Sequence, residues 1–186
     1  MRCENLFLVG PMGAGKTTIG KRVADRLGFR FMDCDRVLEE RTGADIPLIF
    51  DLEGETGFRA REKSLLDELT QLKAIVLATG GGAVLDPANR NALGTRGFVV
   101  LLRTSVEEQL RRTRFDRARP LLQTPDRQQR LLQMAETRNP LYESIADFAI
   151  GTDGRRVHRV VHQIIREYER KREQELRQVA MQHGNP

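Results

Sequence analysis

A glycine-rich segment near the start of the chain, GPMGAGKTT at residues 10–18, constrains the fold more than any other stretch. It follows an apolar run, LFLV at 6–9, and leads into a segment whose apolar residues are spaced at three and four. This order of strand, loop and helix fits the pattern G-x-x-x-x-G-K-[ST], in which backbone N–H groups and a helix N-terminus converge on phosphate oxygens. The segment therefore predicts a β–α unit that binds a nucleoside triphosphate.

The side chains of this loop have separate expected roles. The glycines let the backbone approach phosphate oxygens without interference from a Cβ atom. Lys16 brings a positive charge to the β- and γ-phosphates, and Thr17 offers its hydroxyl to Mg²⁺. We expect nucleotide contacts from Gly13, Ala14, Gly15, Lys16, Thr17 and Thr18.

Short apolar runs alternate with segments of helical periodicity along the rest of the chain. The expected strands are residues 6–9, 29–32, 74–78, 98–102 and 148–150. The expected helices include residues 18–27, 58–69, 105–113 and 127–136, and a last helix that begins near 157 and turns polar after Tyr168. Such alternation predicts an α/β fold with a mostly parallel sheet and helices on both faces. No linker divides the chain, so we expect one domain over 1–186, with its core at about 4–168 and a polar extension at about 169–186.

Composition narrows the possible partners. The formal net charge of +5 favours anionic partners, which include nucleic acid, acidic membranes and phosphorylated small molecules. Aromatic residues make up only 5% of the chain, so stacking platforms for single-stranded nucleic acid are scarce. No segment approaches the ~20 apolar residues that cross a bilayer. Cys3 and Cys34 are too few for a disulfide framework, and we expect reduced thiols in a soluble cytoplasmic protein.

Two aspartates follow the expected strand at 29–32, and no other expected strand is followed directly by a carboxylate. P-loop enzymes commonly hold Mg²⁺ with the loop hydroxyl and an aspartate at the end of another strand. If extended backbone continues through Asp33, Cys34 and Asp35, both carboxylates point to one side and the thiol to the other. One carboxylate can then face the Mg²⁺ shell and the other an acceptor hydroxyl. The alternative for Asp35 is a structural one, the N-cap of the following helix.

Three arginines are candidates for anion recognition, because guanidinium groups suit carboxylates and phosphates. Arg59 precedes Glu62 by three residues, a helical spacing at which an ion pair fixes the guanidinium. Arg138 lies just before a proline break, and Arg119 ends a stretch, RRTRFDRAR, with five arginines in nine residues. That basic stretch predicts a mobile lid at about 112–124. Solvation is the alternative for each arginine taken singly.

The strand expected at 74–78 runs into Thr79 and then three glycines, Gly80, Gly81 and Gly82. Glycines have no side chain to pack, so their backbone N–H groups are free to approach a ligand closely. The alternative is a flexible β–α turn. We favour the ligand, since a turn alone seldom needs all three.

Taken in order, the motifs resemble those of the shikimate kinase family: GPMGAGKTTIG, MDCDR, GFRAREK, ATGGGAV, RRTRFDRARPLL and RNPLYE. The resemblance extends from the first strand to about residue 165. It implies the three-layer P-loop fold of the nucleoside monophosphate kinase type, with a five-stranded parallel sheet in the order 2-3-1-4-5. It also implies transfer of the γ-phosphoryl group of ATP to the 3-hydroxyl of shikimate, a step on the route to chorismate and the aromatic amino acids, by a monomer.

The resemblance further implies roles on the nucleotide side. Thr17 and Asp33 would hold Mg²⁺, and Lys16 and Arg119 would act on the transferring phosphate as catalytic cations. Arg112 would pack on adenine. A second contact to the base lies near 153–156 in the family, where the pattern is loose, and it stays unassigned.

On the acceptor side, Asp35 would receive the substrate hydroxyl as hydrogen-bond acceptor and base. Arg59 and Arg138 would hold the shikimate carboxylate, and Gly81 and Gly82 would place the ring through backbone contacts.

Other functions remain open from the residues alone. A kinase for a gluconate-like acid or a nucleoside monophosphate shares the P-loop and lid, but is not expected to combine the aspartate pair, the three glycines and RPLL. A nucleotide-dependent regulator or nucleic-acid-binding protein would need a basic face away from the ATP site. A GTPase is disfavoured because the sequence has no N-K-x-D segment.

Overall fold

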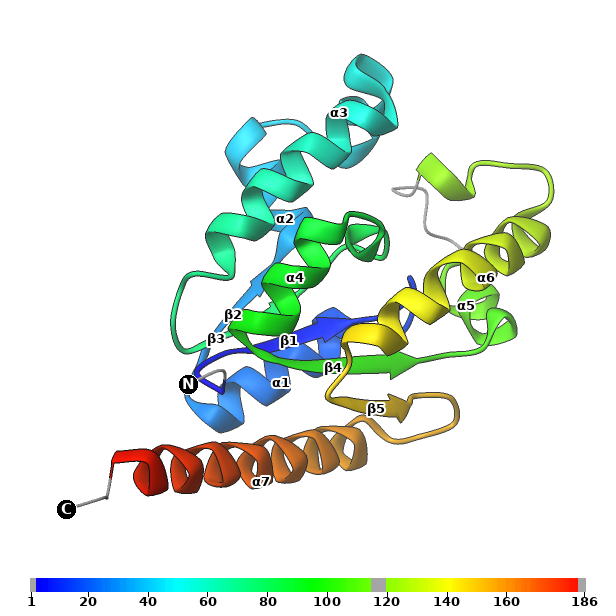
Figure 1. Ribbon diagram of the computed structural model, residues 1–186. Coiled ribbons are helices and arrows are strands. Elements are labelled where there is room, and N and C mark those ends of the chain that lie inside the picture. Colours follow the sequence, from blue (N-terminus) through cyan, green and yellow to red (C-terminus); the bar gives the residue numbers. More distant parts are fainter. Residues whose placement is uncertain (1–2, 115–119, 184–186) are drawn as a thin grey trace.

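Five parallel strands form one sheet in the order β2-β3-β1-β4-β5 (Figure 1). The computed structural model describes residues 3–114 and 120–183. The strands are β1 (Leu6–Val9), β2 (Arg30–Asp33), β3 (Ile75–Ala78), β4 (Phe98–Arg103) and β5 (Phe148–Gly151). The strand order confirms the expected α/β fold, and each strand lies within one residue of its predicted position.

Helices cover both faces of the sheet. The α-helices are α1 (Lys16–Leu27), α2 (Cys34–Thr42), α3 (Ile46–Leu69), α4 (Pro87–Arg96), α5 (Val106–Arg112), α6 (Arg127–Ile145) and α7 (Val157–His183). Two short 3₁₀ helices are η1 (Ala83–Leu85) and η2 (Pro120–Leu122). Figure 1 shows α1 and α7 on one side of the sheet, and α3, α4 and α6 on the other.

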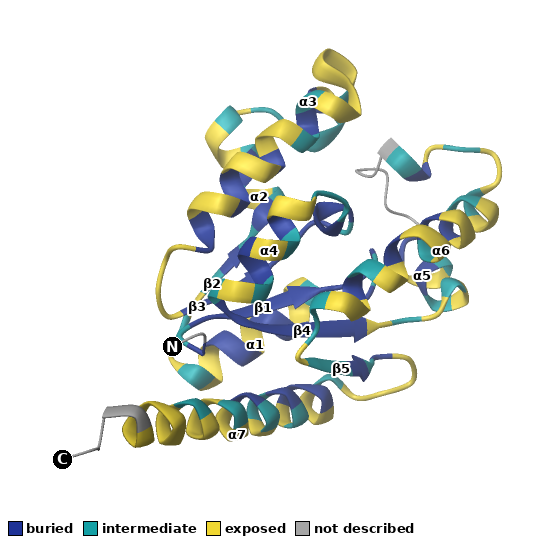
Figure 2. Cartoon of the chain, viewed as in Figure 1, coloured by how far each residue is buried: buried dark blue, intermediate teal, exposed yellow. Residues whose placement is uncertain are grey.

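The alternation of side chains along the strands divides the core in two. In β1, Phe7 and Val9 belong to the cluster beneath α2, α3 and α4, whereas Leu6 and Leu8 belong to the cluster beneath α1 and α7. Because both faces are covered, the inner strands β1, β3 and β4 consist almost wholly of buried apolar residues, whereas the edge strands β2 and β5 are only partly buried (Figure 2). The end of β1 lies between β3 and β4, at the switch point of the strand order, where α/β sheets form ligand-binding crevices.

The helix predicted at 58–69 is longer than expected, because α3 begins at Ile46. Asp45 caps its start, and its side chain accepts a hydrogen bond from the N–H of Leu48 at 2.9 Å. Gly54, at φ 69° and ψ −177°, interrupts the helical geometry and divides α3 into two parts. Few residues other than glycine adopt that conformation. Because of this kink, the apolar residues before Gly54 do not continue the helical spacing of residues 58–69, and the first part of α3 was not predicted.

The polar extension continues α7 as helix to His183. Glu175 accepts hydrogen bonds from the backbone N–H of Cys3 at 3.0 Å and from its thiol at 3.3 Å. Tyr168, which precedes Glu175 in α7, donates its hydroxyl to the carbonyl of Cys3 at 2.9 Å. These contacts tie the start of the described chain to α7. None of the described helices is long and apolar enough to cross a membrane.

Candidate active site

The glycine-rich loop connects β1 to α1 and leaves the start of that helix open to a ligand. Gly10 has φ 136°, and a Cβ atom there would overlap the carbonyl of Leu102 in the neighbouring strand. The N-cap of α1 is Gly15, and no side chain caps the first N–H groups of the helix. Lys16 lies over the loop, and its Nζ donates to the carbonyls of Gly10 at 2.6 Å and Pro11 at 2.9 Å. Uncapped N–H groups beside a cation form an anion-binding site.

Thr17 and Asp33 meet at one edge of this loop. The hydroxyl of Thr17 donates to Oδ2 of Asp33 at 2.7 Å, although the two residues come from α1 and the end of β2. Mg²⁺ is commonly bound by one or two carboxylates while it keeps several waters. Within the described residues, no group of three or more His, Cys, Asp or Glu side chains gathers as a metal site. The hydroxyl of Thr17 and the carboxylate of Asp33 beside the phosphate loop are oxygen groups of the kind that Mg²⁺ binds.

The backbone around the two aspartates differs from the extended geometry that we expected. β2 ends at Asp33 and α2 begins at Cys34, so the strand does not continue through Asp35. The alternative for Asp35 is also wrong, because Asp33 occupies the N-cap position of α2 and Asp35 lies within its first turn. Both aspartates nevertheless line the same cleft.

Cys34 lies between the aspartates and points into the core. Burial raises the pKa of its thiol well above the ordinary value, and the negative charges of Asp35, Glu62 and Asp33 add to that effect. A thiol held protonated in this way is a poor nucleophile.

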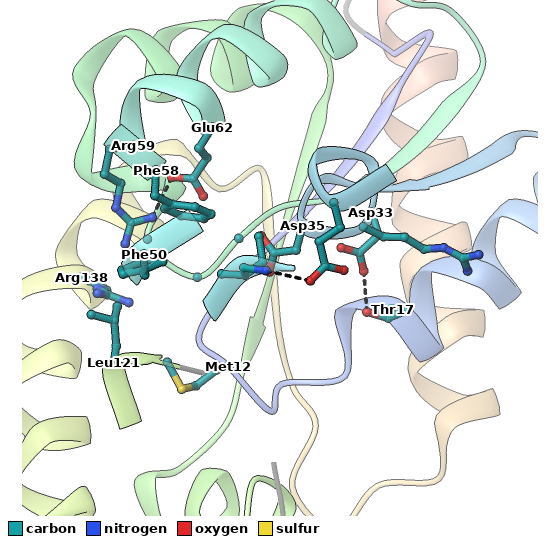
Figure 3. Close-up of a pocket in the computed structure, with 16 residues that line it drawn as sticks. Met12, Thr17, Asp33, Asp35, Phe50, Phe58, Arg59, Glu62, Leu121 and Arg138 are labelled. Atoms are coloured by element: carbon teal, nitrogen blue, oxygen red, sulfur yellow. Dashed lines mark hydrogen bonds and ion pairs between the residues drawn. The ribbon is translucent and has the colours of Figure 1, made fainter. Parts of the chain in front are cut away.

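A cleft of about 310 Å³ opens beside the phosphate loop (Figure 3). In Figure 3, Arg59 and Arg138 lie at one end of the labelled residues, Thr17 and Asp33 lie at the other, and Asp35 lies between them. The lining residues come from the loop, β2, α2, α3, the turn after β3, η2 and α6, and comprise Met12, Thr17, Asp33, Asp35, Arg36, Glu39, Ile46, Phe50, Phe58, Arg59, Glu62, Gly80, Gly81, Gly82, Leu121 and Arg138.

Arg59 is fixed on the wall of the cleft by carboxylates of its own helix. Its Nη1 lies 2.7 Å from Oε2 of Glu62, and its Nη2 lies 3.0 Å from Oε1 of Glu55. The guanidinium also lies over the ring of Phe58, 5.1 Å from the centroid. The predicted pair of Arg59 and Glu62 is confirmed.

Glu62 is itself part of the cleft, which its spacing from Arg59 did not predict. Its side chain is only 2% exposed, and its Oε1 has no hydrogen-bond partner among the described residues. Burial raises the pKa of this carboxyl above its ordinary value, and Arg59 opposes that effect. In the sequence, the spacing of Glu62 from Arg59 indicates an ion pair. That spacing does not indicate that Glu62 is buried.

Arg138 lies on α6 and is buried, with 8% of its surface exposed. It forms no ion pair with a carboxylate of the described chain. Burial lowers the pKa of its guanidinium from the ordinary value. Tyr142, one turn further along, donates its hydroxyl to the carbonyl of Gly81, and burial raises the pKa of that phenol to about 12. A buried guanidinium without a carboxylate partner is a site for an anionic group of a ligand.

The three glycines line the cleft, but two of them have a role that we did not predict. A Cβ atom on Gly82 would overlap the guanidinium of Arg59, and one on Gly80 would overlap the carboxylate of Glu62. A Cβ atom on Gly81 would have more room, because its nearest neighbour, the N atom of Met12, would lie 3.5 Å away. Gly80 and Gly82 therefore allow the charged side chains of α3 to pack against the turn.

Arg112 lies at the rim of the phosphate loop. Its Nη1 donates to the carbonyl of Gly13 at 2.9 Å and to the hydroxyl of Thr152 at 3.0 Å, and its Nε bonds Glu108 at 2.7 Å. The expected lid at about 112–124 is described only in part, and Arg119 lies outside the described residues.

Asp153, in the region left unassigned for the base, connects two loops. Its carboxylate accepts hydrogen bonds from the hydroxyl of Thr104 and from the N–H of Ser105, the latter at 2.8 Å. Nothing in its sequence context predicts this contact.

Comparison with known proteins decides the family. The family model for shikimate kinase matches residues 12–169. The chain belongs to the shikimate kinase family. The shikimate kinase of Vibrio parahaemolyticus is 55% identical over 163 residues, which cover 88% of this chain and 95% of that protein.

Solved structures of the shikimate kinase family agree with this assignment. The shikimate kinase from Acinetobacter baumannii in complex with shikimate is 49% identical, with a TM-score of 0.86 over 88% of this chain and 91% of that one. A gluconokinase from Sinorhizobium meliloti is 15% identical with a TM-score of 0.64, covers 95% of this chain and 98% of its own, and shows the shared fold alone.

Proposed function

We propose that this member of the shikimate kinase family transfers the γ-phosphoryl group of ATP to the 3-hydroxyl of shikimate, giving shikimate 3-phosphate and ADP. One observation carries the proposal for the site. Two arginines, a carboxylate and the Thr17–Asp33 pair follow one another along a single cleft of about 310 Å³ beside the phosphate loop. An acceptor with a carboxylate at one end and a hydroxyl at the other matches that order.

Arg59 and Arg138 bind the carboxylate of the acceptor. Arg138 contributes a buried cation without a carboxylate partner in the described chain, and Arg59 contributes a guanidinium held by Glu55 and Glu62. Gly81 and Gly82 border the ring between these arginines and Asp35. Together these contacts fix the orientation of the acceptor, which is where much of the rate enhancement in phosphoryl transfer originates.

Asp35 receives the 3-hydroxyl as hydrogen-bond acceptor and takes up its proton as the new P–O bond forms. Because the transition state of phosphoryl transfer is loose in most analyses, little proton removal is needed before it, and orienting the oxygen is part of the role of Asp35.

On the donor side, the N–H groups of the loop and the start of α1 bind the phosphates, together with Lys16. Arg112 borders the nucleotide at Gly13, where it packs on adenine, and Arg119 is proposed to contact the phosphates. Thr17 and Asp33 would hold Mg²⁺, which neutralises charge on the β- and γ-phosphates when bound.

We further propose that the enzyme is a cytoplasmic monomer that acts on small molecules, without a nucleic-acid or membrane partner. Light scattering after gel filtration tests the monomer, because a mass of twice 21.2 kDa would contradict it.

The proposed function is tested by measuring ADP release with shikimate, gluconate or a nucleoside monophosphate as acceptor, with and without Mg²⁺. We expect release only with shikimate and Mg²⁺, and a single phosphate at O3 in the ³¹P NMR spectrum of the product. Faster turnover of gluconate or of a nucleotide than of shikimate would contradict the proposal.

A further inference from the structure

Arg127 is outside the cleft, yet it contacts the segment that supports the phosphate loop. It is the first residue of α6, directly after the N-cap Asp126. Its Nη2 donates to the carbonyl of Thr113 at 2.8 Å and lies 3.3 Å from the hydroxyl of that residue, while its Nη1 donates to the carbonyl of Arg114 at 3.3 Å. The side chain thus connects the start of α6 to the end of α5.

The contact is a charged one in a partly buried place. Within the described residues, Arg127 forms no ion pair with a carboxylate, and its Nε is buried without a hydrogen-bond partner. The last carbonyls of a helix have no partner within the helix and carry the negative end of its dipole. Thr113 is the C-cap of α5, so the guanidinium satisfies the carbonyls at that end.

The end of α5 in turn packs on the phosphate loop. A Cβ atom on Gly13 would lie 3.4 Å from Cγ2 of Thr113 and 3.6 Å from Cβ of Arg112. Thr113 is only 2% exposed, and its hydroxyl donates to the carbonyl of Gln109 at 2.8 Å. Arg112, the neighbouring residue, bonds the carbonyl of Gly13. The end of α5 therefore faces Gly13 with the methyl group of Thr113, close enough to leave little room for a side chain there, and bonds its carbonyl through Arg112.

We propose that Arg127 is a positioning residue for the nucleotide. It holds the end of α5 against Gly13, and this contact sets the position of both the loop and Arg112. Arg127 acts through Thr113 and does not touch the nucleotide itself. The inference rests on the proposed nucleotide site and deepens it, because it assigns control of that site to a residue of α6.

The test compares Arg127→Met, which keeps the aliphatic length and loses the charge, with Arg127→Lys, which keeps the charge. Arg159→Met is the matched control, because Arg159 is an exposed arginine of α7 on the opposite face of the sheet. We expect Arg127→Met to raise the KM for ATP roughly tenfold, as the loss of charged hydrogen bonds predicts. The KM for shikimate should stay within about twofold, since the acceptor arginines are untouched.

The ATP affinity of Arg127→Lys distinguishes a positioning role from a general loss of stability. A planar fork bonds two carbonyls at once and an ammonium does so poorly, so Arg127→Lys should restore part of the ATP affinity of Arg127→Met. Calorimetric titration of the free enzyme with ATP measures this without turnover. If Arg127→Met does not fold, Arg127→Lys alone decides, and an unchanged KM for ATP in a folded Arg127→Lys overturns the proposal.

A double-mutant cycle tests whether the effect passes through Thr113. Thr113→Ser removes the methyl group that faces Gly13 and keeps the hydroxyl. If Arg127 acts through this contact, Thr113→Ser raises the KM for ATP less in the Arg127→Met background than in the wild type. Additive effects overturn the route through Thr113, and equal increases in both KM values overturn the positioning role. Failure of the proposed function is seen separately, as absence of shikimate-dependent ADP release by the wild type.

Discussion

Gly82 and Arg59 are packed so closely that a β-carbon on the glycine would occupy the place of the guanidinium. The same guanidinium is held from the other side by Glu62, at 2.7 Å. Arg59 thus has a defined position, because the turn after β3 carries no side chain at Gly82. If Arg59 binds the acceptor as proposed, a side chain at position 82 should disturb that binding.

Gly82→Ala is expected to displace Arg59 and to lower kcat/KM for shikimate by roughly 10- to 100-fold, which is the range for a misplaced substrate-orienting group. The KM for ATP should stay unchanged. Steady-state kinetics with each substrate varied in turn measures both. Gly94→Ala is the control: Gly94 lies in α4 with open space where its Cβ atom would go, so this change should stabilise the helix by about 0.5–1 kcal/mol and leave the kinetics as they are.

Asp35→Asn is expected to retain ATP affinity and to lower kcat by at least ~10²-fold, because the amide neither accepts the hydroxyl proton nor orients the oxygen as a carboxylate does. Calorimetry with ATP and pre-steady-state measurement of the chemical step test these two expectations. Turnover close to that of the wild type would show that Asp35 does not have the assigned role.

Arg138→Lys should raise the KM for shikimate roughly tenfold while kcat changes less, because a point charge cannot replace a planar fork at a carboxylate. Titration calorimetry with shikimate measures the affinity directly. Arg166→Lys on α7 provides a matched exchange at an exposed arginine. Equal shikimate affinities for Arg138→Lys and the wild type would contradict the carboxylate contact.

Asp33→Asn should raise the Mg²⁺ concentration needed for half-maximal activity, since one of the two proposed oxygen ligands loses its charge. Activity is measured against free Mg²⁺ at saturating ATP and shikimate. At high Mg²⁺ we expect the variant to recover part of its rate, whereas Asp35→Asn should not recover. An unchanged Mg²⁺ dependence would argue against Asp33 as a ligand.

Glu62→Gln is expected to change how stability depends on pH. Because the pKa of Glu62 is raised above its ordinary value of 4.5 in the folded protein, the folded state binds that proton more tightly than the unfolded state. The resulting stability is fully present below the unfolded pKa and is lost as pH rises through the folded pKa. The wild type should therefore lose Tm relative to Glu62→Gln as pH rises above 4.5, which thermal melts at several pH values measure. A pH-independent difference in Tm would contradict the direction of this shift.

The parts of the site that the sequence predicted are those encoded by residues close together in the chain. The glycine-rich loop, the aspartates after β2 and the pair of Arg59 and Glu62 each involve residues a few positions apart, and local geometry dictates where they lie. The extended backbone considered through Asp35 is not found, because α2 begins directly at the end of β2 and the apolar pattern does not mark that position.

Other features depend on contacts between distant segments. The fit of Arg59 to Gly82, the burial of Glu62 and the contact of Arg127 with Thr113 join residues that no periodicity relates. The first part of α3 was missed for a local reason, since Gly54 interrupts the helical pattern. Arg119 stays a prediction, because it lies outside the described residues.

The link between Cys3 and Glu175 also has a practical consequence. It brings the beginning of the described chain onto α7, on the amino-terminal side of the sheet, whereas the cleft lies at the carboxyl ends of the strands (Figure 1). A purification tag, a fluorophore or an attachment to a solid support beside Cys3 would lie away from the entrance used by the substrates. Immobilised or fused versions of this protein should therefore keep their substrate affinities.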